Sequence, residues 1–133
     1  MGIVAAGPRP TLMDALTPVL AMLDQAGIRV TLDYSKLNPT GCYLGPPELD
    51  YRFKAGDFTA AYTLLVVAGA NDGTRAVQVL SAELDRVIVA LGNQPVTARP
   101  VAVMPSDNSN VLLGMEVSWS SRIRGQSNGG VTP

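Results

Sequence analysis

Carboxylates are the main side chains of this sequence that could carry acid–base chemistry, and three of them, Glu48, Asp50 and Asp57, make one connection in the middle of the chain acidic, with Arg52 and Lys54 partly offsetting them. The chain has no histidine, which removes the commonest general base and the commonest metal ligand. An enzyme with this sequence would therefore have to work with carboxylates and hydroxyls alone. The acidic residues do not pair at a spacing typical of a catalytic or metal-binding site.

Sequence motifs for nucleotide, zinc or nucleophilic chemistry are also missing. There is no phosphate-binding loop, no G-x-S-x-G and no H-E-x-x-H, and the single cysteine, Cys42, cannot form a zinc site alone. One cysteine also excludes an internal disulfide and fits a reducing compartment, or a particle assembled in one. We therefore expect a protein that is not an enzyme and has no catalytic residues, no cofactor and no metal site.

Length and composition predict one globular domain. The chain has 133 residues and is 47% hydrophobic, which allows a sizeable core. We expect a flexible arm at 1–10, a single domain at 11–121 and a flexible tail at 122–133. A formal net charge of −1 without a basic stripe argues against sequence-specific nucleic-acid binding. No run approaches the roughly 20 apolar residues of a membrane span, and the N-terminus lacks a signal-peptide pattern.

The middle of the chain predicts a long strand followed by a long helix, which organise the fold. The strand covers residues 59–68, and its second half is apolar at every position, so both of its faces should be covered. Residues 70–73 have turn chemistry, and Asp72 can cap the helix that follows. This helix should run to about Leu91, where Gly92 helps to end it.

The long helix has two apolar stripes. The first follows 3.6-residue spacing and should pack on the sheet: Val77, Leu80, Leu84, Val87, Ile88 and Leu91. The second lies on another side of the helix and is mixed with polar residues: Arg75, Val79, Ala82, Arg86 and Val89. Scattered surface valines are common, so this stripe is either ordinary surface or a contact face for another subunit.

The N-terminal part predicts a helix and then a strand. Thr11 caps the helix, with Asp14 three residues on as a weak capping box, and Gly27 stands where the helix ends. Pro18 leaves two possibilities, one helix with an irregular first half, which we prefer, or a second helix start. Residues 28–33 alternate as a strand. Its buried side chains should be Ile28, Val30 and Leu32.

The remaining segments predict further strands. A long, loop-rich connection holds a short strand at 41–44 and is long enough to be functional. A strand at 96–104 is interrupted by Pro100, which favours an edge position or a bulge. Residues 111–120 alternate well, with Trp119 as a core or rim anchor. The order of elements predicts an α+β fold, a mostly antiparallel β-sheet with two α-helices packed on one face.

Three segments have a recognisable layout. The first helix ends in Ala26-Gly27 and leads to the strand Ile28-Arg-Val-Thr. Asp33 is followed by Leu37-Asn-Pro-Thr-Gly-Cys-Tyr-Leu44, and Tyr62-Thr-Leu-Leu-Val-Val-Ala68 runs into Asn71-Asp72 and the long helix. This layout resembles the tail terminator proteins of long-tailed bacteriophages, also known as minor tail or tail completion proteins, particularly those of phages that infect actinobacteria.

The resemblance covers most of residues 11–120 but departs from the family at one point. The family frequently has asparagine, two prolines and glycine before a strand, and Thr40 stands in place of the second proline. The motifs are not chemically specific, so the match is one of layout.

The resemblance implies a structural virion protein that is made in the host cytoplasm. It implies a homo-oligomeric ring of six subunits at the head-proximal end of the phage tail. Such a ring stops polymerisation of the tail tube protein and offers a docking surface to the head completion, or stopper, proteins. DNA passes through its centre without sequence-specific binding. No catalysis, cofactor or membrane is implied.

A ring contact is heterologous, because a patch on one subunit meets a different patch on the next. The candidate for one patch is the second helix stripe, Arg75, Val79, Ala82, Arg86 and Val89. The strand near Pro100 or the 111–120 strand could supply the other patch. The acidic connection, Glu48, Asp50, Arg52, Lys54 and Asp57, should face a neighbouring ring or the channel, where carboxylates would repel DNA phosphates.

Three other functions fit the same sequence. A head–tail connector, or neck protein, also forms rings of small α+β subunits but would not limit tail length. A small carboxylate-dependent enzyme or ligand-binding domain would need polar groups that converge in a pocket. A general oligomerisation module would self-associate without binding a tail tube.

Overall fold

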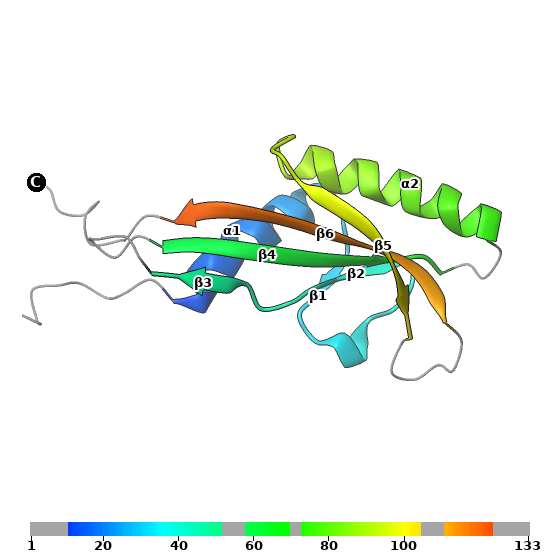
Figure 1. Ribbon diagram of the computed structural model, residues 1–133, viewed down its shortest axis with the longest axis horizontal. Coiled ribbons are helices and arrows are strands. Elements are labelled where there is room, and N and C mark those ends of the chain that lie inside the picture. The colour runs from blue at the N-terminus through cyan, green and yellow to red at the C-terminus, as the bar shows by residue number, and fades with distance from the viewer. Residues whose placement is uncertain (1–10, 52–57, 70–72, 105–110, 124–133) are drawn as a thin grey trace, which may run out of the picture.

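The structure is a computed structural model, and it describes residues 11–51, 58–69, 73–104 and 111–123. The described residues form two α-helices, a short 3₁₀ turn and six strands (Figure 1). In chain order these elements are α1 (Leu12–Gln25), β1 (Val30–Thr31), η2 (Tyr34–Lys36), β2 (Gly41–Leu44), β3 (Glu48–Asp50), β4 (Phe58–Val67), α2 (Gly73–Ala90), β5 (Thr97–Val103) and β6 (Leu112–Ile123).

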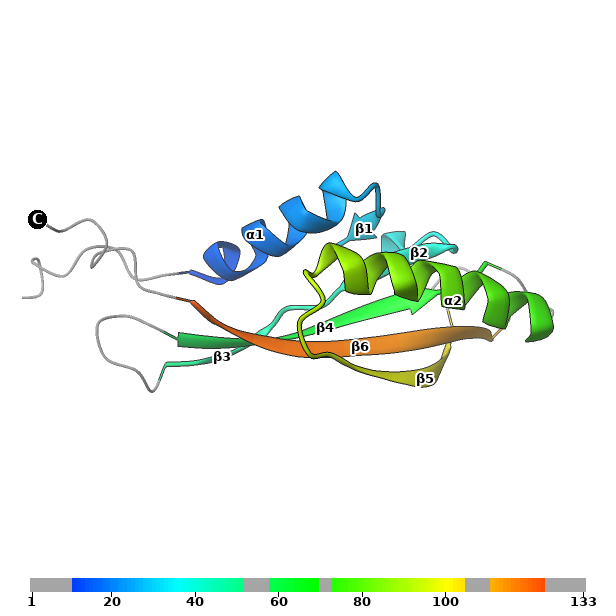
Figure 2. The same cartoon turned by 90° about the horizontal axis from the view of Figure 1, so that it is seen from above.

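The strands form one sheet in the order β1-β2-β4-β6-β5, and β3 also pairs with β4. The β1–β2 pair is parallel and the other pairs are antiparallel. The strands β4 and β6 pair along their length, from Phe58 opposite Ile123 to Val67 opposite Gly114. Both helices lie on one face of this sheet (Figure 2). The predicted α+β class, with a mostly antiparallel sheet, is confirmed.

Alternation along β4 forms the main core. The side chains that face the helices are buried: Phe58, Ala60, Tyr62, Leu64 and Val66. From α1 they meet Ala15, Leu16, Val19 and Leu23, and from α2 they meet Ala76, Leu80 and Val87. Trp119 of β6 joins this core with 6% exposure, as predicted. Burial of each large apolar side chain stabilises the fold by about 1.5–3 kcal/mol.

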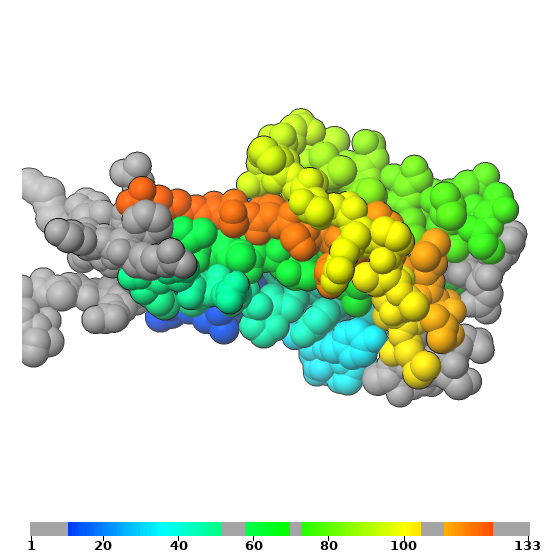
Figure 3. Space-filling view, viewed as in Figure 1, coloured from blue at the N-terminus to red at the C-terminus, as the bar shows by residue number. Residues whose placement is uncertain are grey.

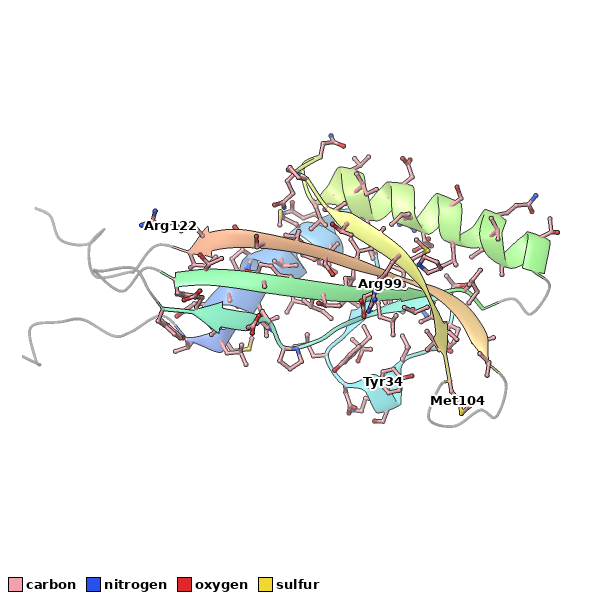
Figure 4. The ribbon with its side chains drawn as sticks, in the orientation of Figure 1. Tyr34, Arg99, Met104 and Arg122 are labelled. Carbon is pink, nitrogen blue, oxygen red and sulfur yellow. The ribbon has the colours of Figure 1, made fainter. Side chains whose placement is uncertain are left out.

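A second, smaller cluster covers the other face of the sheet at one end. Leu37, Val67, Val103 and Leu112 are buried together there. Tyr34 of η2 lies against Tyr43, with ring centroids 5.4 Å apart, and donates a 2.8 Å hydrogen bond to the carbonyl oxygen of Met104 (Figure 4). The segment around η2 therefore closes over the end of β4, and the prediction that this end is covered on both faces is confirmed.

The single N-terminal helix and the edge position of Pro100 are confirmed, whereas the irregular first half expected for that helix is not seen. The helix α1 runs without a break through Pro18, which is exposed, so the N-terminal segment is one helix. The strand β5 contains Pro100 and lies at the edge of the sheet. The edge position agrees with the missing N–H of proline, because on an edge strand the proline nitrogen can face solvent, where no hydrogen bond to a neighbouring strand is lost. The predicted cap Asp72 lies outside the described residues.

The prediction for the first strand was wrong at Leu32, which is 44% exposed. Ile28 is buried and Val30 is half-buried, but the strand β1 has only two residues. The chain turns immediately afterwards, because the Asp33 carboxylate accepts hydrogen bonds from the backbone N–H and the hydroxyl of Ser35. These bonds lower the pKa of Asp33 and begin η2, so Leu32 leaves the sheet.

The prediction for the first turn of the long helix was also wrong. Val77 is 57% exposed, whereas Ala76 is buried against the sheet. Leu80, Val87 and Leu91 are buried as predicted, and Leu84 and Ile88 are half-buried. Val77 lines a groove beside the edge strand β5, so no part of the sheet covers its side chain.

Two strand boundaries differ from the sequence prediction. The connection predicted as a loop holds β3, which pairs with β4 after Gly45, Pro46 and Pro47 interrupt the edge. The strand β6 runs to Ile123 and so includes two residues assigned to the tail. Both strands gain their hydrogen-bond partners from β4, which is distant in sequence, so local pattern alone could not show them.

Candidate subunit-contact surfaces

Two charged residues of the acidic connection, Glu48 and Asp50, lie in the part of the sheet that the structure describes. Glu48 and Asp50 belong to β3 and stand opposite Ala61 and Thr59 of β4, on the face turned away from the helices. Arg52, Lys54 and Asp57 lie outside the described residues. Within the part of the chain that the structure describes, no group of three or more metal-ligating side chains comes together.

The face that carries Glu48 and Asp50 is polar along much of its length. Pairing places hydroxyl-bearing and charged side chains from three strands there: Thr59, Thr63, Thr97, Arg99, Glu116, Ser118, Ser120 and Arg122. Arg99 donates a 2.7 Å hydrogen bond to Glu116. Arg99 and Arg122 lie well apart along the sheet (Figure 4). The face therefore carries charges of both signs and does not form a purely acidic surface.

The second stripe of α2 does not form one free surface. Val79 is half-buried and packs against the core, whereas Val89 is 59% exposed. Arg86 reaches across to the end of α1, where it donates hydrogen bonds of 3.0 and 3.1 Å to the carbonyl oxygens of Ala26 and Gly27. It also pairs with Glu83 at 2.7 Å.

Three residues of that stripe remain available on the surface of the isolated chain: Arg75, Ala82 and Val89. Whether they contact another subunit stays a prediction. Val79 and Arg86 have clear roles within the chain, the first in the core and the second in tying α2 to α1.

An apolar groove between α2 and β5 was missed by the sequence analysis. One hollow, of about 300 Å³, is lined by Val77, Leu80, Ser81, Leu84, Pro100, Leu113 and Met115. A second, of about 460 Å³, shares Pro100 and Leu113 with it and continues along Gly73, Ala76, Val101, Ala102, Val111 and Leu112. In Figure 3 the orange atoms of β6 are visible between the green α2 and the yellow β5.

The available sequence signal for this groove was the combination of Val77 with Pro100. Val77 belongs to the apolar stripe, but Pro100 marks β5 as the last strand. A helix that projects over the last strand leaves apolar side chains without a partner from the sheet, and this is where the groove lies.

A second apolar surface lies at the other end of the subunit. Leu12 and Met13 in the first turn of α1 are 41% and 51% exposed, and Tyr51 just after β3 is 49% exposed. The first turn is held by the predicted capping box, in which the Thr11 N–H donates to the Asp14 carboxylate at 2.6 Å and the Asp14 N–H donates to the Thr11 hydroxyl at 3.3 Å. Figures 1 and 2 show that α1 begins and β3 ends at the end of the molecule opposite to the start of α2.

Cys42 is a core residue of β2 with 2% exposure. Burial raises the pKa of its thiol to about 12, the negative charge of Glu83 acts in the same direction, and Arg86 acts in the opposite one. The thiolate is the nucleophilic and metal-binding form, so this side chain is poorly suited to either chemistry.

Among the described residues, no helix is long and apolar enough to cross a bilayer. A scan against protein-family models finds no match for this chain, and a search of curated proteins finds none either.

Proposed function

We propose that this protein is a tail terminator of a long-tailed bacteriophage. In this proposal, copies of the chain form a ring of six subunits at the head-proximal end of the tail tube. The ring stops polymerisation of the tube protein and presents a surface to the head completion protein. It acts by contact alone, without a catalytic or cofactor site, and DNA passes through its centre.

The observation that carries the proposal is the spatial arrangement of the three segments that resemble the family. Val30 in the first segment pairs with Cys42 in the second, and Cys42 pairs with Val66 in the third. The three segments therefore form adjacent strands, β1, β2 and β4, and β4 leads toward α2. The three segments that resemble the family are therefore neighbours in the fold as well as ordered in the sequence. This supports the interpretation that they resemble the family together, as one structural unit.

The exposed apolar surfaces support the assembly part of the proposal. Val77 and Val89 of α2 and Met13 of α1 are each more than half exposed. Val77 and Val111, each 57% exposed, line an apolar groove between α2 and β5, and an exposed apolar patch of this kind is typical of protein–protein contacts. A single chain with this surface would gain stability from burial in an oligomer.

In the assembled ring, we assign the polar face of the sheet to the channel or to a neighbouring ring. Glu48, Asp50 and Glu116 would repel DNA phosphates at short range. Arg99 and Arg122 on the same face would offset part of this repulsion. The expected result is a surface to which DNA adheres weakly.

Deletion of the gene from the phage that encodes it tests the function directly. Electron microscopy of the lysate should show tails of excessive and variable length without attached heads. Restoring the gene on a plasmid should return both normal tail length and head attachment.

The other outcomes identify the alternatives. Tails of normal length beside DNA-filled heads would assign the protein to the head–tail connector instead. Intact, infectious virions after deletion would remove the protein from this part of the particle altogether.

A further inference from the structure

A segment between β1 and β2, residues 32–40, covers one end of the sheet face that both helices leave free (Figure 2). We call this segment the strap. Leu37 is its one buried residue, Tyr34 and Pro39 are half-buried, and the other six are exposed. The strap therefore has almost no core of its own, and its attachment to the sheet depends on few side chains.

Three strands supply the apolar side chains beneath the strap. Val67 of β4, Val103 of β5 and Leu112 of β6 are 0%, 4% and 5% exposed, and they form one buried cluster with Leu37. Among the described residues in or against this cluster, Leu37 and Tyr34 are the two that do not belong to a strand. If the strap moved away, the three strand side chains would lie on a face of the sheet that neither helix covers.

Two hydrogen bonds that attach the strap to neighbouring segments are exposed to solvent. The Tyr34 hydroxyl donates to the Met104 carbonyl oxygen at 2.8 Å (Figure 4). The Gly69 N–H donates to the Thr40 hydroxyl at 2.9 Å. Water can replace the lost partner in both bonds when the strap lifts, so opening leaves neither donor buried and unpaired.

The opposite face of the central strand is covered in a different way. Val66, the residue before Val67, is also 0% exposed, but it belongs to the main core together with Cys42, its partner on β2. Both helices contribute to that core, and Arg86 ties α2 to the end of α1. Exposing Cys42 therefore requires loss of the main core, whereas exposing Val67 requires loss of one small cluster. Segments with few buried contacts open at a lower cost in free energy than the core does.

We propose that the strap opens as a unit while the two helices and the central strands stay folded. In the closed form, this end of the sheet presents polar side chains of the strap, among them Asp33, Lys36 and Asn38. In the open form, it presents the apolar side chains of β4, β5 and β6. The strap is therefore a cover that controls whether this apolar surface meets solvent, and a ligand that binds only the open form would favour opening. This inference does not depend on the proposed function.

Labelling of a buried thiol tests the opening. Val67→Cys places a thiol beneath the strap, and the native Cys42, which is 2% exposed on the neighbouring strand, is an internal control in the main core. The folded variant is treated with N-ethylmaleimide at several urea concentrations below its unfolding transition. Mass spectrometry of proteolytic fragments gives a rate for each thiol. Dividing each rate by that of the same thiol in the unfolded chain removes differences in intrinsic reactivity.

The expected result is that the thiol of Val67→Cys reacts many-fold faster than Cys42. Its rate should also depend only weakly on urea, because opening of the strap exposes little surface, whereas the rate of Cys42 should rise steeply. Equal normalised rates with the same urea dependence would overturn the inference, since the strap would then open only when the whole chain unfolds.

Hydrogen exchange of the unaltered protein gives a second test that needs no variant. The Gly69 N–H, which is bonded to Thr40 of the strap, should exchange faster than the most protected amides of β4 and β6, and with a weaker dependence on urea. Exchange of Gly69 that is as slow as in these strands, with the same urea dependence, would contradict independent opening even if Val67→Cys failed to fold.

Discussion

The hydroxyl of Tyr62 on the central strand donates a 2.6 Å hydrogen bond to the carbonyl oxygen of Ala15 in the first helix. The two residues are 47 positions apart in the sequence, and both are buried. The Tyr62 ring is stacked on Trp119, with centroids 5.1 Å apart and planes 20° apart. This one side chain therefore positions α1 on the sheet and joins β4 to β6.

Tyr62→Phe should lower the free energy of unfolding by about 1–2 kcal/mol, because it removes a buried hydrogen bond and leaves the Ala15 carbonyl with one partner fewer. Urea unfolding followed by fluorescence of Trp119, the single tryptophan, measures the loss. Tyr34→Phe is the matched control, since its hydrogen bond to Met104 is exposed and water can replace the hydroxyl. Equal decreases in the free energy of unfolding in the two variants would show that the buried hydrogen bond of Tyr62 stabilises the fold no more than the exposed hydrogen bond of Tyr34.

Arg86→Ala should lower the free energy of unfolding by about 1 kcal/mol. Arg86 donates hydrogen bonds to the end of α1 and forms an ion pair with Glu83, and the partial exposure of its side chain weakens both interactions. Arg75→Ala, on the exposed side of the same helix, should change stability by less than about 0.5 kcal/mol. Thermal unfolding of dilute protein compares them. A larger loss for Arg75→Ala would contradict the assigned role of Arg86.

Gly114→Ala should cost about 1–3 kcal/mol, because the added methyl group would lie 2.8 Å from a methyl of Val103 and 2.9 Å from the backbone oxygen of Val66. The Val66 oxygen belongs to the central strand and cannot move away easily. Gly73→Ala is the control, since no atom of the described residues lies within 4 Å of its added methyl group and alanine favours a helix. Chemical unfolding should therefore show a loss for Gly114→Ala and no loss for Gly73→Ala.

Stability should fall as the pH rises above about 9, owing in part to Cys42. Its pKa is raised from 9.0 to about 12, chiefly by burial, so the unfolded thiol ionises before the folded one. The unfolded state then binds fewer protons, and the contribution that is fully present below pH 9 is lost as the pH approaches 12. Burial also raises the pKa of Tyr62, which adds to the loss in the same direction.

Urea unfolding from pH 7 to pH 11 measures this dependence. Cys42→Ala should reduce the slope of stability against pH above pH 9, although the lost side chain lowers stability at every pH. Tyr62→Phe should remove a further share of the slope. An unchanged slope in Cys42→Ala would mean that other groups control the alkaline loss. In the folded protein at neutral pH, a maleimide should leave Cys42 unmodified, and it should react after unfolding.

Local patterns in the sequence were sufficient for much of the fold. The apolar second half of β4 predicted a covered central strand, Pro100 predicted an edge, and the pair Thr11 and Asp14 predicted the start of α1. These features depend on residues within a few positions of each other, or on a backbone donor that proline lacks wherever it stands. Alternation also placed Trp119 in the core.

The candidate surfaces depended on contacts between distant segments. The helical pattern put Val77 in the core and Arg86 on a contact face, because periodicity gives the angle of a residue around its helix but not what lies opposite. The tertiary structure leaves Val77 beside the edge strand β5 and brings Arg86 to the end of α1. Likewise, β3 is a strand because β4 supplies its partners.

Spacing and residue type were enough to predict the class of the fold, the two helices, the central strand and the lack of histidine or paired-cysteine chemistry, because these properties are local. The apolar residues that remain uncovered at the two ends of the subunit could be found only from the packed structure. Coverage depends on where the sheet ends and which segment reaches a given side chain, and those are properties of the packed chain as a whole.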